Sequence, residues 1–204
     1  MTISQPARHQ PPQPSTALGI QSTGYLAMIL FILSEATLFG VLLSAYFYLE
    51  SGTKHWPPNG ISKPDLVLPI IATIILALSS GPVWWADRGI AHGRAWQLRL
   101  GFAITFGMGL VFLAIQAYEY TDLGFSASTN AYGSLFILIT GIHFLHVVVG
   151  LLMNLFIQLR AWLGHFTAER RLAVQNAALY WHFVDVVWIV IFLSLIVSPH
   201  LMSK

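Results

Sequence analysis

The sequence predicts an all-α integral membrane protein, a bundle of five transmembrane helices. Of its 204 residues, 56% are hydrophobic and only 9% are charged, whereas about 25% of an ordinary soluble domain is charged. Five apolar runs are each long enough for the hydrocarbon core of a bilayer, which takes about 20 helical residues. Five strands of this composition would be too few and too apolar for a barrel, so the runs are predicted to be helices.

Each run is bounded by a short polar segment with turn-forming residues. We expect helices over residues 25–49, 66–86, 98–118, 131–159 and 172–197. The segments between them are SGTKHWPPNGISKPD, DRGIAHGRAWQ, TDLGFSASTN and RAWLGHFTAER. Pro69 and Pro82 lie near the ends of the second run, where a helix tolerates proline best. Residues 22–204 are therefore predicted to form a single transmembrane domain.

The first 21 residues have a different composition. Four prolines fall within the first 20 residues, and few side chains there could form a core. We expect residues 1–21 to be a disordered tail. They lack the charged region, short apolar core and cleavage site of a signal peptide.

Charge limits the partners and predicts an orientation. The net charge is only +2 and the sequence contains no basic patch, so a nucleic-acid partner is not expected. The absence of cysteine excludes disulfides and thiolate metal sites. Seven basic residues fall on the side of the N-terminus and three on the other, which favours an N-terminus inside and a C-terminus outside. The seven are Arg8, Arg88, Arg94, Arg99, Arg160, Arg170 and Arg171, and the three are Lys54, Lys63 and Lys204.

Strongly polar side chains lie inside the apolar runs, although a charge at bilayer depth costs about 2.5–3.5 kcal/mol on insertion scales. They are Glu35, His143, His146, His182 and Asp185, with Glu119 at the outer end of the third run. Helical spacing places them on stripes. The stripes are Thr140, His143, His146, Gly150 and Asn154 on the fourth run, and Gln175, Ala178, His182 and Asp185 on the fifth. Such stripes are expected to face protein rather than lipid.

Several functions fit this pattern. The side chains could form a hydrogen-bond network between helices that stabilises packing. Two carboxylates and three histidines could instead hold a dinuclear metal site, or His182 could pair with His143 or His146 across a haem. A proton relay is a third interpretation. Small-molecule transport is less favoured, because no run is broken into half-helices.

Four segments carry a resemblance to a known family. In chain order they are SEATLFG, QAYEY, AYGSLFILITGIHFLHVVVGLL and YWHFVDVVWI. Together they resemble subunit III of the haem–copper terminal oxidases, the cytochrome c oxidase subunit 3 family, from about residue 24 to residue 197. The chain is similar to the short, five-helix bacterial form, which lacks the two additional N-terminal helices of the longer form.

The resemblance implies a non-redox subunit of a proton-pumping respiratory oxidase. Haem and copper would then be held by partner subunits I and II, with no catalytic or metal-binding residue in this chain. The resemblance further implies direct packing against subunit I, bound phospholipid, support of proton uptake over repeated turnover, and a location in the bacterial inner membrane. The resemblance also implies a proton-related or lipid-related role for the matching polar positions in the interior. These positions are Glu35, Glu119, His143, His146, His182 and Asp185.

Two alternatives accompany this prediction. The complex could oxidise quinol instead of cytochrome c. The chain could also be a stand-alone membrane metal or haem protein that uses a set of five side chains: Glu35, His143, His146, His182 and Asp185. Metal or haem that stays with the isolated chain would distinguish this second alternative from the accessory subunit.

Overall fold

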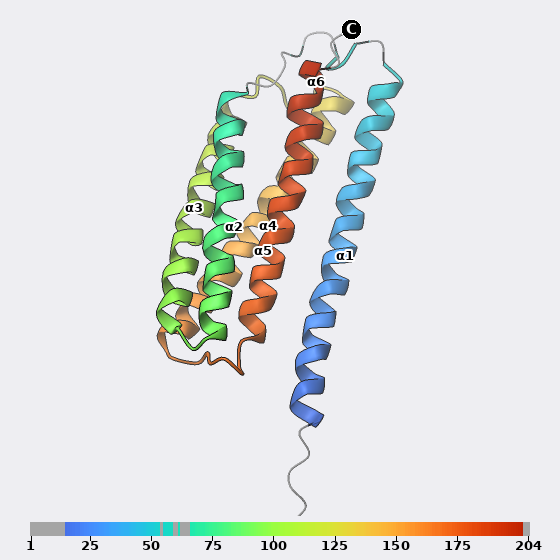
Figure 1. Ribbon diagram of the computed structural model, residues 1–204. Coiled ribbons are helices and arrows are strands. Elements are labelled where there is room, and N and C mark those ends of the chain that lie inside the picture. The colour runs from blue at the N-terminus through green and yellow to red at the C-terminus, as the bar shows by residue number, and fades with distance from the viewer. Residues whose placement is uncertain (1–14, 54, 59–60, 62–65, 202–204) are drawn as a thin grey trace, which may run out of the picture.

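The computed structural model describes residues 15–53, 55–58, 61 and 66–201. In this part of the chain there are no strands, and five helices are long and apolar enough to span a membrane, as predicted. They are α1 (Ser15–Ser51), α2 (Val67–Ala91), α3 (Ala95–Thr121), α4 (Ala131–Trp162) and α5 (Leu172–Ile191). A π-helical segment, Phe192–Val197, and the short helix α6 (Ser198–Leu201) continue α5 (Figure 1).

Most of the helices are longer than the apolar runs that predicted them. Helix α2 ends at Ala91 rather than at residue 86, and α3 begins at Ala95 rather than at residue 98. The added residues include Asp87 and Arg88, which are too polar for an apolar run but keep their helical backbone hydrogen bonds. Hydropathy marks the hydrocarbon-spanning part of a helix, whereas the helix itself continues into the membrane surface.

The start of α1 differs from the expected tail. Helix α1 begins at Ser15, so it includes residues 15–21 of the segment that was expected to be a tail. The prolines of the N-terminal region end at Pro14, and no residue from 15 to 24 prevents a helix from extending back from the apolar run. The rest of the predicted tail, residues 1–14, lies outside the described residues.

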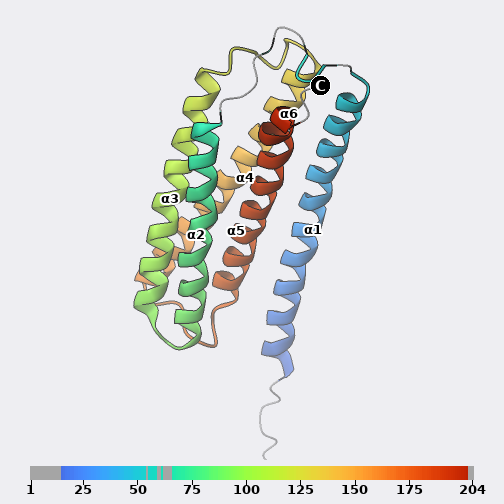
Figure 2. The ribbon, with the colours of Figure 1, turned by 45° about the horizontal axis from the view of Figure 1, so that its top comes forward.

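Helix α5 lies at the centre of the bundle and α1 at its edge. Helix α5 contacts α1, α2 and α4, whereas α2 and α3 form a closely packed antiparallel pair. Figures 1 and 2 both show α1 standing away from α2 and α3. In the most apolar 18-residue stretch of the last span, Leu172–Leu201, 50% of the residues are buried. In the corresponding stretch of α1, 6% are buried. The bundle is therefore built around α5, and α1 is its least enclosed helix.

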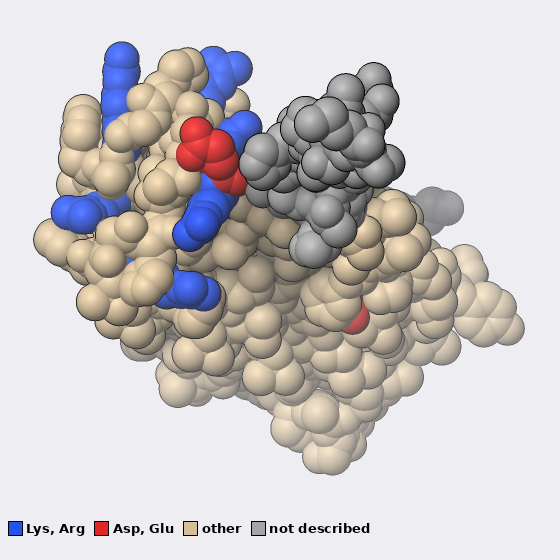
Figure 3. Space-filling view, turned by 90° about the horizontal axis from the view of Figure 1, so that it is seen from below, with Lys and Arg blue, Asp and Glu red and all other residues tan. Residues whose placement is uncertain are grey.

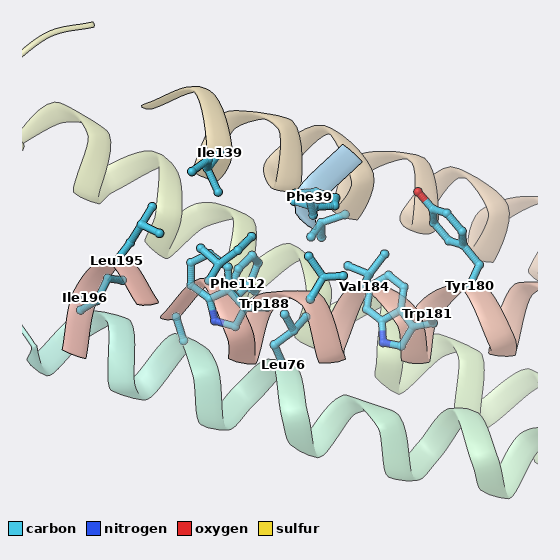
Figure 4. Packing of buried hydrophobic residues seen from close by; sticks show 14 of the residues in the cluster. Phe39, Leu76, Phe112, Ile139, Tyr180, Trp181, Val184, Trp188, Leu195 and Ile196 are labelled. Atoms are coloured by element: carbon cyan, nitrogen blue, oxygen red, sulfur yellow. The ribbon is translucent and has the colours of Figure 1, made fainter. Parts of the chain in front are cut away.

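The core consists of large side chains of α5 that meet small or aromatic residues of its neighbours. Trp188 is fully buried, and its ring centroid lies 4.9 Å from that of Phe112 on α3 (Figure 4). Trp181 is packed between two glycines. A Cβ atom on Gly109 or Gly150 would come within 2.8 Å or 2.9 Å of its ring. Glycine at these positions lets α3 and α4 approach α5 closely.

One end of the bundle is basic and rich in tryptophan. Six arginines of the described residues lie where α2 ends, α3 begins, α4 ends and α5 begins, and Figure 3 shows this end from below. The Arg88 guanidinium lies 3.9 Å from the ring centroid of Trp84, and that of Arg99 lies 4.9 Å from the ring centroid of Trp162. Both tryptophans are exposed. Exposed tryptophan beside arginine is typical of the membrane–water interface.

The predicted orientation can be tested because the chain has no cysteine of its own. We expect His165→Cys, in the exposed loop before α5, to react with a membrane-impermeant maleimide only after right-side-out vesicles are opened. Ser128→Cys, in the exposed loop before α4, should react in intact vesicles. The opposite pattern of labelling would contradict an arginine-rich cytoplasmic end.

Candidate functional site

The predicted polar residues form separate pairs between helices rather than one cluster. Glu35 of α1 meets His146 of α4, where His146 Nε2 lies 3.0 Å from Glu35 Oε2. His146 Nδ1 lies 2.8 Å from the carbonyl oxygen of Ile142 in its own helix. Aromatic rings enclose the pair, with Phe39 edge-on to His146 at 5.1 Å and Tyr180 stacked at 6.5 Å. The side chains are only 14% (His146) and 22% (Glu35) exposed.

The contacts of His146 determine how protons are distributed in this pair. A carbonyl oxygen only accepts hydrogen bonds, so His146 Nδ1 must carry a hydrogen to bond Ile142. The hydrogen bond between Nε2 and Glu35 then contains one proton, held either by the histidine or by the carboxyl group. Either arrangement leaves the pair with no net charge, which is the condition for burying it at low cost in a membrane.

His143 has a different environment, although it lies only three residues before His146. Its side chain is 1% exposed, and its Nε2 donates to the carbonyl oxygen of Val184 on α5 at 3.2 Å. Its Nδ1 is buried without a hydrogen-bond partner among the described residues. Three residues rotate a helix position by about 300°, so the two side chains diverge by about 60°. His143 points toward Trp188 at 4.8 Å, whereas His146 points toward α1.

His182 and Asp185 both contact Ser80, which is not among the predicted site residues. Ser80 of α2 places its hydroxyl 2.9 Å from His182 Nδ1 and also donates it to Asp185 Oδ2. Asp185 is 4% exposed, whereas Ser80 and His182 are half-buried. A serine in an apolar run is common, so only the crossing of α2 and α5 identifies this one.

Two further hydroxyl groups hold α2 to α5. The indole Nε1 of Trp181 donates to Ser79 Oγ at 2.8 Å, and that of Trp188 donates to Thr73 Oγ1 at 3.0 Å. The two tryptophans are seven residues apart, so they lie on the same side of α5 two turns from each other. These tryptophans are not among the predicted site residues, yet they form a hydrogen-bonded ladder between the two helices.

Glu119 lies apart from the other predicted residues, near the C-terminal end of α3. It accepts a hydrogen bond from Gln116 Nε2 at 3.2 Å in its own helix. The neighbouring Tyr120 donates to Thr140 Oγ1 of α4 at 2.8 Å. The contact of this part of α3 with α4 is thus made by Tyr120.

The described part of the chain does not bring the predicted metal-binding side chains together at one point. No group of three histidine or acidic side chains there could hold one metal ion. The residues of that set divide between the Glu35–His146 pair, the isolated His143 and the His182–Asp185 pair with Ser80. Most of their ring nitrogens already have hydrogen-bond partners inside the bundle.

An apolar groove of about 430 Å³ opens between α1, α4 and α5 toward the arginine-rich end. Its lining includes Met28 of α1, Met153 and Phe156 of α4, and Ala173 of α5. The Arg160 guanidinium lies 5.4 Å from the ring centroid of Phe156, one helical turn nearer the membrane surface. The groove thus combines an apolar body with a cation at its end.

Comparisons with known proteins agree with this architecture. The family described as cytochrome c oxidase subunit III matches residues 15–198, which include the helices α1 to α5. The chain is 39% identical to cytochrome c oxidase subunit 3 of Thermostichus vulcanus, over 82% of this chain and 83% of that protein. It is 40% identical to that of Synechocystis, over 81% and 72%, and 37% identical to that of Mus musculus, over 82% and 67%.

The Glu35–His146 contact predicts non-additive variants. Glu35→Leu or His146→Leu should each lower the free energy of unfolding by about 1–3 kcal/mol, because each leaves the other group without its partner. The double variant should lose little more than either single variant, with a coupling energy of about 0.5–3 kcal/mol. The measurement is a denaturant titration of the full chain in mixed micelles.

Ser44→Ala is the matched control on α1. The Ser44 hydroxyl donates to the carbonyl oxygen of Gly40 in its own helix, so its removal should leave α1 attached as before. Additive losses from Glu35→Leu and His146→Leu would show that the two side chains do not interact.

Proposed function

The chain belongs to the cytochrome c oxidase subunit III family, and on that premise we propose that it is the non-redox subunit III of a proton-pumping cytochrome c oxidase in a bacterial inner membrane. Family membership makes it a membrane subunit of a respiratory oxidase, in complex with other oxidase subunits. The observation that carries the proposal is the match over residues 15–198, because it includes the helices α1 to α5 and both buried pairs.

In this proposal haem and copper are bound by partner subunits I and II. The chain's own histidines support such a division of labour. His146 uses both ring nitrogens in hydrogen bonds, so neither is free to bind a metal. A histidine nitrogen must have its lone pair free to bind a metal. The role of this subunit is then to support assembly of the complex, lipid binding and sustained proton uptake.

The outward face of α1 supports direct packing against subunit I. Helix α1 has one side against α4 and α5, and its opposite side carries Thr37, Gly40 and Ser44. A Cβ atom on Gly40 would meet no described atom within 4 Å. Small side chains on a membrane helix let a second helix approach closely, which favours contact with protein. We therefore place the surface that binds subunit I on this face.

The groove between α1, α4 and α5 supports a bound phospholipid. Its lining is mostly apolar, and the Arg160 guanidinium lies 5.4 Å from the ring centroid of Phe156, which is one of the lining residues. A guanidinium group binds phosphate through paired N–H donors. In this proposal, an acyl chain occupies the groove and the phosphate contacts Arg160.

Purification of the tagged chain from its native membrane tests the accessory role. We expect haem absorbance to accompany the larger subunits that co-purify with the chain. Once the chain is separated from those subunits, it should show no haem absorbance of its own. Gly40→Leu should reduce the co-purified haem several-fold while the chain remains in the membrane, because leucine fills the space for a neighbouring helix.

Gly107→Leu provides the matched control, since Gly107 of α3 also has open space around its Cβ position among the described residues. It should leave the amount of haem unchanged. Haem or metal that remained with the isolated chain would contradict the accessory role, and loss of haem with Gly107→Leu alone would place the binding surface on α3.

The lipid proposal predicts an effect of filling the groove. Ala173→Phe should displace the acyl chain and lower the phospholipid that stays with the complex, measured by native mass spectrometry after mild delipidation. Ala103→Phe makes the same change at an exposed position of α3 outside the groove. Equal lipid retention in the two variants would argue against a lipid at this site.

A further inference from the structure

The hydroxyl of Ser80 connects an imidazole to a carboxyl group at the crossing of α2 and α5. Ser80 Oγ lies 2.9 Å from His182 Nδ1 and also contacts Asp185 Oδ2. A serine hydroxyl donates one hydrogen bond and accepts up to two. It can therefore accept from one of these neighbours only while it donates to the other.

The two ends of this chain of groups differ in burial. Asp185 is 4% exposed, and its second oxygen, Oδ1, is enclosed without a hydrogen-bond partner in the described part of the chain. His182 is half-buried. Among the described residues, Ser80 provides the hydrogen bond that reaches this carboxyl group. His182 is the less buried of the two groups that Ser80 connects.

We propose that His182, Ser80 and Asp185 form a proton-exchange site, in which a proton passes between His182 Nδ1 and the buried carboxyl group of Asp185 through the hydroxyl of Ser80. In one state, His182 is an imidazolium whose Nδ1–H donates to Ser80 Oγ, and Ser80 donates to the carboxylate. When Nδ1 gives its proton to Ser80 Oγ, the hydroxyl proton passes to Asp185 Oδ2. The products are a neutral imidazole and a carboxylic acid, and all protons are accounted for.

Attachment of α2 to α5 does not by itself require these groups. The hydroxyl–indole bonds of Ser79 with Trp181 and of Thr73 with Trp188 already join the same two helices. A carboxyl group at this depth is expensive, at about 2.5–3.5 kcal/mol on insertion scales when charged. A relay explains why an ionisable pair is kept beside a neutral ladder that already performs the structural task.

The charged groups around the relay are Asp87 with Arg171 and Glu35 with His146, and Asp87 also acts electrostatically on His182. On α2, Asp87 lies two turns from Ser80 and faces Arg171 at the start of α5, with 3.8 Å between Arg171 Nη1 and Asp87 Oδ1. On α1 and α4, Glu35 and His146 share one proton with each other. The proposal goes beyond the accessory role and does not depend on which subunit binds the chain.

Hydrogen–deuterium exchange of the Asp185 carboxyl group tests this proposal. The full chain, with the subunits that co-purify, is transferred to heavy water at a pH where infrared spectra show the carboxylic acid band that Asp185→Asn removes. The shift of this band measures the exchange rate. Ser80→Ala and His182→Phe should each slow exchange by roughly a hundredfold, the lower end of the effect of a positioned proton-transfer group.

Two controls separate proton transfer from packing. Ser80→Thr retains a hydroxyl and should restore most of the rate. Ser79→Ala removes a hydrogen bond between the same two helices without touching the relay, so the parental rate should remain. Parental rates in Ser80→Ala and His182→Phe, equal slowing in Ser79→Ala, or the lack of any band assignable to Asp185 would each overturn the proposal.

Discussion

The absence of water from the hydrocarbon core is the constraint on which the rest of this structure depends. Each polar side chain that the helices carry into it must find a partner on another helix or on its own backbone. Glu35 and His146 meet this requirement with one shared proton, and Asp185 meets it through Ser80. The partnered side chains set how α1, α2, α4 and α5 are arranged relative to one another.

The central position of α5 follows from the same constraint. One side of the helix carries Trp181 and Trp188, whose indole groups reach hydroxyl groups of α2. Glycines of α3 and α4 make room for Trp181, so aromatic bulk on α5 is matched by small residues around it. Helix α5 thereby joins α2, α3 and α4 into one unit, while α1 attaches mainly through Glu35 and a few aromatic contacts.

This difference in enclosure suits a subunit of a larger complex. The least buried helix leaves an outward face with small residues and an apolar groove on its other side. Both features are natural contacts for a neighbouring subunit and for lipid. The central unit, in contrast, keeps its ionisable groups inside, so any proton chemistry of this chain would take place within its own helices rather than at a partner surface.

The sequence by itself determined that the chain spans the membrane with five helices, and its motifs identified the family, because hydropathy and local motifs need no knowledge of distant contacts. It also determined which residues are polar at depth, such as Glu35 and Asp185. Only the tertiary structure decided the partners. His146 rather than His143 meets Glu35, and Ser80, 105 positions from Asp185, joins it to His182. Helical spacing predicts the face of one helix, whereas pairing depends on how two helices cross, and that is set by the packing of the whole bundle.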